Sequence, residues 1–153
     1  CLLGNDVYEG GQWNKTLLAS SIFSSVEIRD KVNTIIHPRV KDDFRQWAKH
    51  HAHFPVVAME SAILIEAGFA GEVDAVVMVY APEEVRINRA MKRDSVSKEL
   101  VERRIKSQMA DEEKCTNADF TIINDGETPL IPQVLKLLAF LSENNSYLCH
   151  PKK

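Results

Sequence analysis

The chain has 153 residues, of which 44% are hydrophobic and 27% charged, and its formal net charge is −3. This length suits one domain with a substantial buried core. The slightly acidic balance argues against nucleic acid or an anionic membrane surface as the partner, because such partners usually select a basic domain. No apolar run approaches the roughly 18 residues of a membrane-spanning helix.

The three cysteines are Cys1, Cys115 and Cys149, an odd and scattered set without a C-x-x-C pair. A disulfide framework or a zinc site is therefore not expected, and a reducing cytoplasm suits the chain best. The chain begins with Cys1 instead of Met and enters a turn-like sequence from Gly4 to Gly11. We therefore expect it to be a fragment of a longer protein.

The first fifty residues favour helices. Asn14 is a suitable cap for a helix running to about Phe23, and Ser24-x-x-Glu27 matches a capping box that opens a second helix. Pro38 suits the first turn of a third helix, since its ring fixes a helical φ and its missing N–H is not needed there. Residues 1–53 are therefore expected to form a helical part that precedes any strand.

The rest of the chain alternates strands and helices. Three β-branched, apolar runs indicate buried strands: Pro55–Met59, Ala75–Tyr80 and Phe120–Ile123. Helices are expected at Ile63–Phe69 with an end at Gly68 or Gly71, after Pro82, after a Ser97 cap, and from Thr128-Pro129 to about Leu141. This alternation predicts an α/β fold with a parallel sheet over residues 54–141, followed by a loosely ordered tail, residues 142–153.

Positive charge is concentrated between Arg86 and Lys114, where nine Lys and Arg residues face six Asp and Glu residues. Arg86, Arg89 and Arg93 are spaced i, i+3, i+7 and share one helical face. The row follows a strand through only Ala81-Pro82, at the carboxyl edge where open α/β sheets bind ligands. A guanidinium row at this edge suits a polyphosphate; the alternative is a solvated face of ion pairs.

A second group on the following helix, Arg103, Arg104 and Gln108, could fold back over a ligand as a lid covering about residues 93–114.

Three further positions have both a functional and a structural interpretation. Asn33 and His37 are one helical turn apart and could jointly bind a ligand, or His37 could simply end a helix before Pro38. Glu60 follows a predicted strand, where a carboxylate can hold Mg²⁺ through water or cap the next helix. Asn124-Asp125-Gly126 is a turn sequence that could also line an adenine pocket.

Taken in order, these pieces resemble the dephospho-CoA kinase family from Gly4 to about Leu141. The residues that carry the resemblance are Asn14-Lys15-x-Leu17, Asn33-x-x-x-His37-Pro38, Ile63-Leu64-Ile65-Glu66, Arg89-x-x-x-Arg93-Asp94, Arg104-Ile105-x-x-Gln108-Met109, Lys114, Ala118-Asp119 and Ile123-Asn124-x-Gly126. Each motif is weak alone, and their order and spacing together are specific.

The resemblance implies a P-loop fold like that of nucleoside monophosphate kinases, with a parallel sheet, a helical substrate-binding part and a lid, here without the first strands. It implies transfer of the ATP γ-phosphoryl group, with Mg²⁺, to the 3′-hydroxyl of dephospho-CoA. Carried over by position, Arg93 and Arg104 are the catalytic residues. Lys15, Asn33, His37 and Arg89 bind the substrate, and Asn124 and Gly126 bind the nucleotide.

The chain also departs from the family pattern. The family's G-x-x-x-x-G-K-[ST] loop and the following strand with an acidic residue are not in these 153 residues, and the family's Asp-x-Pro becomes Glu60-Ser61-Ala62. We therefore expect barely detectable kinase activity from the chain alone. Without a central strand, Pro55–Met59 and Ala75–Tyr80 should either pair directly or be completed by another chain through self-association.

Two alternatives remain at this point: another small-molecule kinase of the same P-loop fold, and a non-catalytic module that binds RNA or acidic partners through its basic helices. The acidic remainder of the chain and the shortage of aromatic stacking residues disfavour the second.

Overall fold

A computed structural model describes residues 8–9, 12–14, 17, 20, 22 and 25–145. The chain divides into two compact units, Cys1–Met59 and Glu60–Lys153. The first unit begins with two short antiparallel strands, β1 (Tyr8–Glu9) and β2 (Gln12–Trp13), in which Tyr8 lies opposite Trp13. The prediction that helices precede any strand is therefore wrong, because β1 and β2 pair ahead of the helices of this unit.

The predicted helix after Asn14 can be followed only in part. The Asn14 side chain accepts the Leu17 N–H at 3.0 Å, as a helix cap does. Most other residues of this predicted helix lie outside the described ones.

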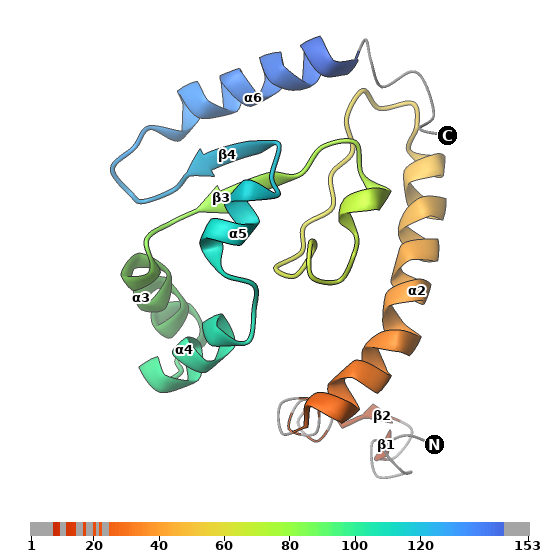
Figure 1. The fold of residues 1–153 in the computed structure, drawn as a ribbon, viewed down its shortest axis with the longest axis vertical. Coiled ribbons are helices and arrows are strands. Elements are labelled where there is room, and N and C mark those ends of the chain that lie inside the picture. The colour runs from red at the N-terminus through yellow and green to blue at the C-terminus, as the bar shows by residue number, and fades with distance from the viewer. Residues whose placement is uncertain are drawn as a thin grey trace. The chain divides into compact units, whose positions relative to one another are not determined.

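One long helix, α2 (Val26–His50), dominates the first unit (Figure 1). Its cap is Ser25, whose hydroxyl accepts the Ile28 N–H at 3.3 Å, whereas the predicted cap Ser24 lies outside the described residues. At the other end, the His51 ring nitrogen Nδ1 lies 2.7 Å from the Trp47 carbonyl. Histidine at a helix end satisfies carbonyls that have no partner within the helix.

Pro38 lies inside α2, so the predicted helix boundary at this residue is wrong. Proline in a helix interior removes one hydrogen bond and crowds the preceding turn, at a cost of about 3 kcal/mol. Here an apolar stripe continues across it, from Val32 before the proline to Val40 and Phe44 after it. The uninterrupted stripe and the caps at both ends favour one helix in spite of the proline.

Residues 55–59 form no strand, which corrects the prediction for Pro55–Met59. Direct pairing of this segment with Ala75–Tyr80 is also wrong, because the latter strand pairs elsewhere. A strand exists only where a neighbour satisfies its backbone groups. The apolar sequence predicted burial between two neighbouring strands, whereas Val56 is half exposed.

The second unit contains a parallel pair of strands, which confirms the predicted α/β class. β3 (Val77–Tyr80) pairs with β4 (Phe120–Ile123), with Val77 beside Phe120. In the described part of the chain, β4 is the one strand that pairs with β3.

The connection between the two strands contains three helices: α3 (Glu83–Asp94), α4 (Lys98–Lys106) and α5 (Asp111–Thr116). The predicted Ser97 cap of α4 is confirmed, since its hydroxyl accepts the Leu100 N–H at 3.4 Å. The predicted start after Pro82 is also confirmed.

The closing helix, α6 (Leu130–Asn145), lies along β4 (Figure 1). It continues past the expected end at Leu141, so residues 142–145 are helical where a loose tail was predicted. The Gln133 side chain bonds both backbone groups of Ile123, accepting its N–H at 2.8 Å and donating to its carbonyl at 2.9 Å. These bonds satisfy backbone groups of β4 that no neighbouring strand of the described chain reaches.

The predicted helix at Ile63–Phe69 is a short turn that ends in a Schellman motif. The Phe69 N–H donates to the Leu64 carbonyl at 2.8 Å, and the Gly68 N–H donates to the Ile65 carbonyl at 2.9 Å. Gly68 takes φ +70°, the left-handed conformation that such an end requires. The short 3-10 helix η2 (Ala70–Glu72) follows directly.

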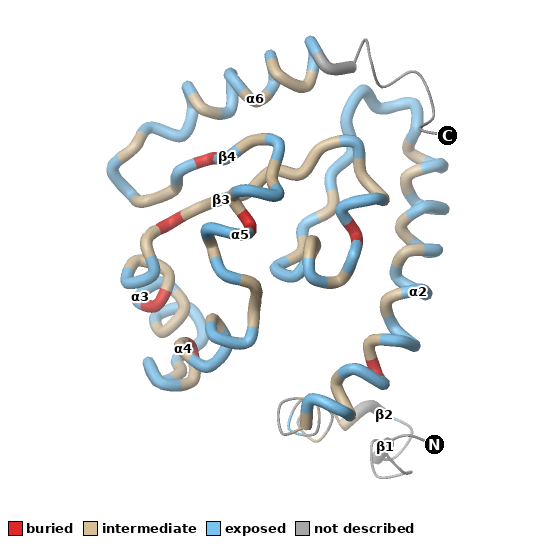
Figure 2. The backbone as a smooth tube through the Cα atoms, viewed as in Figure 1, coloured by how far each residue is buried: buried red, intermediate tan, exposed pale blue. Residues whose placement is uncertain are grey.

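The core of the second unit is small (Figure 2). Its buried hydrophobic residues are Phe69, Ala81, Ile87, Val101 and Ile122. Ile87 and Val101 come from α3 and α4, which pack against one another, so part of the core lies on the arginine-bearing helices. Of the helices in the described part of the chain, none combines the length and the apolar character needed to cross a bilayer.

Candidate functional site

Arg93 and Arg104 meet at one carboxylate. Arg93 donates from Nε to Asp94 Oδ1 at 2.7 Å and from Nη2 to Asp94 Oδ2 at 3.1 Å. Arg104, on α4, donates from Nη1 to Asp94 Oδ2 at 3.3 Å. Two guanidinium groups that are separate in sequence are therefore brought together between the end of α3 and the last turn of α4, with a net positive charge.

The pairing also sets the charge state of the carboxyl group. The hydrogen bonds from Arg93, helped by the charge of Arg104, hold the pKa of Asp94 below its ordinary value of 3.8. Asp94 therefore stays ionised at neutral pH and offsets one of the two positive charges.

Arg89 lies against the loop that follows β4. Its Nη1 donates to the Asn124 carbonyl at 2.7 Å, and the Asn124 N–H in turn donates to the Tyr80 carbonyl at 2.7 Å. The structure thus brings together Arg89, Asn124 and Gly126, which the sequence analysis had assigned to two different ligands. Arg89 joins α3 to the loop proposed to contact the nucleotide.

Gly126 adopts φ +99°, a backbone conformation that residues with a side chain rarely adopt. A Cβ atom added there would lie 3.5 Å from Arg89 Nη2, an ordinary contact. We therefore expect Gly126→Ala to lower the free energy of unfolding by about 1–2 kcal/mol through backbone strain alone. Urea denaturation of the 153-residue chain measures this change.

Gly71→Ala is the matched control, because a Cβ at Gly71 would meet nothing within 4 Å. We expect its stability to stay within about 0.5 kcal/mol of the starting chain. Equal losses in both variants would contradict the assignment of strain to Gly126.

Asp125 shapes the same loop from within. Its carboxylate accepts the Thr128 N–H at 2.7 Å and the Glu127 N–H at 2.9 Å. These backbone bonds, with one from the Thr128 hydroxyl, hold the pKa of Asp125 below its ordinary value. The acidic side chain is therefore used to fold the loop, and Asn124 and Gly126 flank it.

Two ion pairs hold α5 against its surroundings. Arg86 on α3 pairs with Asp111 at the start of α5. Lys114 on α5 is largely buried, and its Nζ lies 3.1 Å from Glu66 Oε1 and donates to the Ala62 carbonyl at 3.1 Å. α5 is thereby fixed on both sides.

Glu66 holds a second part of the lid segment as well. Its Oε1 atom accepts the Met109 N–H at 2.9 Å. Burial by itself would raise the pKa of Glu66, but backbone hydrogen bonds, that from Met109 among them, and the Lys114 cation outweigh this and keep the pKa below 4.5. The C-terminal end of the predicted lid is therefore anchored to the turn at residues 62–69.

Three of the remaining candidate residues belong to the first unit, and Glu60 belongs to the second. Asn33 and His37 lie one turn apart on α2, as their spacing predicted, and both are partly exposed. Lys15 lies outside the described residues. Glu60, which opens the second unit, is exposed and follows a segment that is not a strand.

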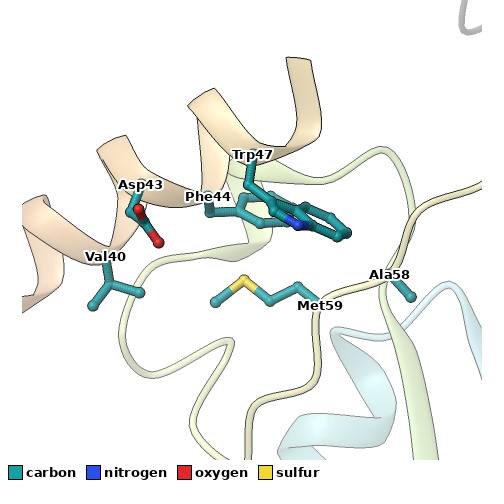
Figure 3. A pocket seen from close by; sticks show the side chains of 6 residues that line it. All are labelled: Val40, Asp43, Phe44, Trp47, Ala58 and Met59. Carbon is teal, nitrogen blue, oxygen red and sulfur yellow. The ribbon is translucent and has the colours of Figure 1, made fainter. Parts of the chain in front are cut away.

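The first unit also contains an open apolar pocket between the second half of α2 and residues 58–59. Figure 3 shows Phe44 and Trp47 reaching from the helix toward Met59. The other lining residues are Val40, Asp43 and Ala58. Because the lining contains a carboxylate and no cation, this pocket does not match a phosphate group.

In the sequence, Gln108 stands out beside the lid arginines and Glu66 as a carboxylate after an apolar run, whereas Asp94 and Lys114 appear only as parts of motifs. Some of their contacts join residues far apart in the chain, such as Glu66 and Lys114, and local spacing does not predict such contacts. One available signal was a Lys at an apolar helix position, since a buried lysine needs an acidic partner. The Arg86–Asp111 pair had no such signal.

Comparison with known proteins gives a consistent picture. The family model described as dephospho-CoA kinase matches residues 2–129. A Bacteroides fragilis protein named dephospho-CoA kinase is 58% identical over 151 residues, covering 99% of this chain and 74% of the relative. A Porphyromonas gingivalis protein of the same name is 41% identical, covering 90% of this chain and 68% of the relative.

Solved structures agree in fold. A crystal structure from Thermus thermophilus superposes with a TM-score of 0.75 at 29% identity, covering 90% of this chain and 71% of that one. A dephospho-CoA kinase from Campylobacter jejuni gives a TM-score of 0.58 at 23% identity, covering 94% of this chain and 72% of that one.

Proposed function

This chain belongs to the dephospho-CoA kinase family, and we propose that it takes part in transfer of the ATP γ-phosphoryl group to the 3′-hydroxyl of dephospho-CoA. In this reaction the 3′-oxygen forms a bond to the γ-phosphorus, the bond to the β,γ-bridging oxygen breaks, and the hydroxyl gives up its proton. The products are ADP and coenzyme A. The chain shares the P-loop kinase-like fold of its structural relatives.

The observation that carries this proposal is the pair of guanidinium groups at Asp94. Phosphoryl transfer places negative charge on the oxygens of the moving group, and catalysis depends mainly on positioning and on positive charge. Arg93 and Arg104 supply two cations against one carboxylate. They are therefore suited to stabilise the transferred group.

The other residues take supporting roles in the proposal. Residues 1–53, with Lys15, Asn33 and His37, bind dephospho-CoA, and the sheet, lid and closing helix in residues 54–141 hold the nucleotide. The loop at Asn124 and Gly126 lies beside the adenine. Arg89 keeps that loop against α3 through the Asn124 carbonyl, which supports a positioning role as well as a substrate contact.

ATP enters this proposal as the magnesium complex. Within residues 25–145 and the other described positions, no group of three His, Cys, Asp or Glu side chains could hold a metal ion. We assign Mg²⁺ to the substrate complex with ATP, where it would offset the charge of the phosphates. Glu60 is not assigned to the ion.

Partners and location follow from the same proposal. The partners are the two small-molecule substrates and no nucleic acid, and the scattered cysteines support a cytoplasmic location. Within the described part of the chain, β3 has β4 on one side and no strand on the other. That open edge is where a strand from outside the described residues, or a second copy of the chain, would pair.

The test is ADP release with MgATP and dephospho-CoA. The 153 residues contain no G-x-x-x-x-G-K-[ST] sequence, so we expect barely detectable turnover from them alone. A chimera in which the phosphate-loop segment of a family member precedes Cys1 should turn over at a rate typical of kinases, on the order of 1–100 per second. A chimera that phosphorylates other small molecules but not dephospho-CoA would refute the proposal.

A further inference from the structure

The end of α3 contains two residues that local stability alone does not favour. Asp94 is the last residue of the helix, where the partial negative charge of the helix end repels a carboxylate. Ser95 follows with φ 54° and ψ 42°, the left-handed region that glycine occupies most easily. Among the described residues, Ser95 is the one non-glycine with positive φ. The break of the helix-end rule at Asp94 points to a role for its carboxylate beyond the stability of α3.

The geometry at this point explains the Asp94 side chain. Its two oxygens accept two N–H groups of Arg93 and one of Arg104, so a single carboxylate connects α3 to α4. The left-handed residue Ser95 ends α3 immediately after Asp94, and α4 begins three residues later.

The side chains of Asp94, Arg93 and Arg104 differ in how far they are exposed to solvent. The Asp94 side chain is 27% exposed, whereas those of Arg93 and Arg104 are 77% and 44% exposed. Asp94 is therefore the least exposed of the three side chains, and the whole cluster is open to solvent.

The unused donors are what a ligand would meet. A guanidinium has five N–H groups, and Arg93 commits two of them to Asp94 while Arg104 commits one. The others have no partner among the described residues. Two guanidinium groups that share one carboxylate and have donors to spare match the several oxygens of a phosphoryl group.

From these observations we infer that Asp94 is the positioning residue of the phosphoryl-transfer site, holding Arg93 and Arg104 in the arrangement that receives the transferred group. This inference rests on the proposed function. Asp94 itself contacts neither substrate. It keeps two long side chains oriented before the substrates bind. The entropy cost of ordering them therefore does not add to the activation barrier.

The kinetic test uses the chimera with the phosphate-loop segment. We expect Asp94→Asn, which keeps the shape and removes the charge, to lower kcat about tenfold or more while KM for dephospho-CoA changes less than about twofold. Asp94→Glu should recover part of kcat, because it restores a carboxylate. A purely structural role would instead lower the thermal midpoint of Asp94→Asn with kcat unchanged, and that result would overturn the inference.

Ser95→Gly is the matched control. It relieves the left-handed backbone and leaves the carboxylate in place, so the thermal midpoint should rise with kcat unchanged. A loss of kcat in Ser95→Gly equal to that of Asp94→Asn would show that the turn matters and the carboxylate does not.

A second measurement separates this inference from the proposed function. In the 153-residue chain, the Arg93 Nε–H resonance in a nitrogen-15 NMR spectrum should be shifted and protected from exchange, and Asp94→Asn should remove both effects. A wild-type chimera without kinase activity would refute the proposed function. An Arg93 signal that is unchanged by Asp94→Asn would refute the positioning role.

Discussion

Replacing Arg104 with Ala should lower kcat of the phosphate-loop chimera by about 100-fold or more, with KM for dephospho-CoA little changed. The physical reason is that Arg104 supplies positive charge that counts most when charge develops on the transferred group. Arg93→Ala should have a similar effect, because both guanidinium groups lie on the same carboxylate. Steady-state ADP release measures both variants.

Lys106→Ala is the charge control for this experiment. It removes a cation from the same helix without touching Asp94, and kcat should stay within about twofold. The double variant of Arg93 and Arg104 should lose less than the product of the two single losses, because residues that act as a unit are not additive. Full additivity would indicate two independent cations and would contradict the paired site.

Lys114→Met should lower the free energy of unfolding of the 153-residue chain by about 2–3 kcal/mol. The Lys114 side chain is only 11% exposed, and its ammonium group faces the Glu66 carboxylate, which is itself 22% exposed. Removing the cation leaves that carboxylate largely covered and without its ion pair, and it also leaves the Ala62 carbonyl without this donor. Urea denaturation followed by circular dichroism gives the change.

Lys136→Met, a change of the same kind on the exposed surface of α6, should alter stability by less than about 0.5 kcal/mol. Similar losses in the two variants would mean that the Glu66–Lys114 pair adds no stability beyond that of an ordinary surface lysine.

The pH dependence of stability gives a check on Glu66 itself. Its pKa in the folded chain lies below the ordinary value of 4.5. A carboxyl group of this kind stabilises the fold above its unfolded pKa, and the contribution is lost as the pH falls through the folded pKa. Glu66→Gln should therefore make the free energy of unfolding fall less steeply below about pH 4.5. An unchanged pH dependence in this range would contradict a lowered pKa for Glu66.

Local sequence patterns determined several parts of this fold because the physics they report is local. Ser97 caps α4, and Gly68 ends the turn at residues 62–69, since both act within a few residues along the chain. Phe120–Ile123 forms a strand with the predicted bounds. The order of the family's motifs, from Asn14 to Gly126, was sufficient to identify the family.

Sequence patterns gave wrong predictions where the structure of a segment depends on a residue or strand far away in the chain. Pro55–Met59 has the composition of a buried strand, but a strand needs a neighbour for its backbone, and the described chain supplies none there. Pro38 predicts a boundary between two helices, but an apolar stripe continues on both sides of it and α2 is a single helix.

What the sequence alone determined, then, is the chemistry available to this protein: a parallel α/β framework and a segregated set of arginines in the order of a dephospho-CoA kinase. Only the tertiary structure decided how those arginines are held. Asp94 gathers Arg93 and Arg104, and Glu66 anchors the lid segment through Lys114 and the Met109 N–H. These contacts cross between elements, and their strength depends on distance and burial, which no spacing along the chain encodes.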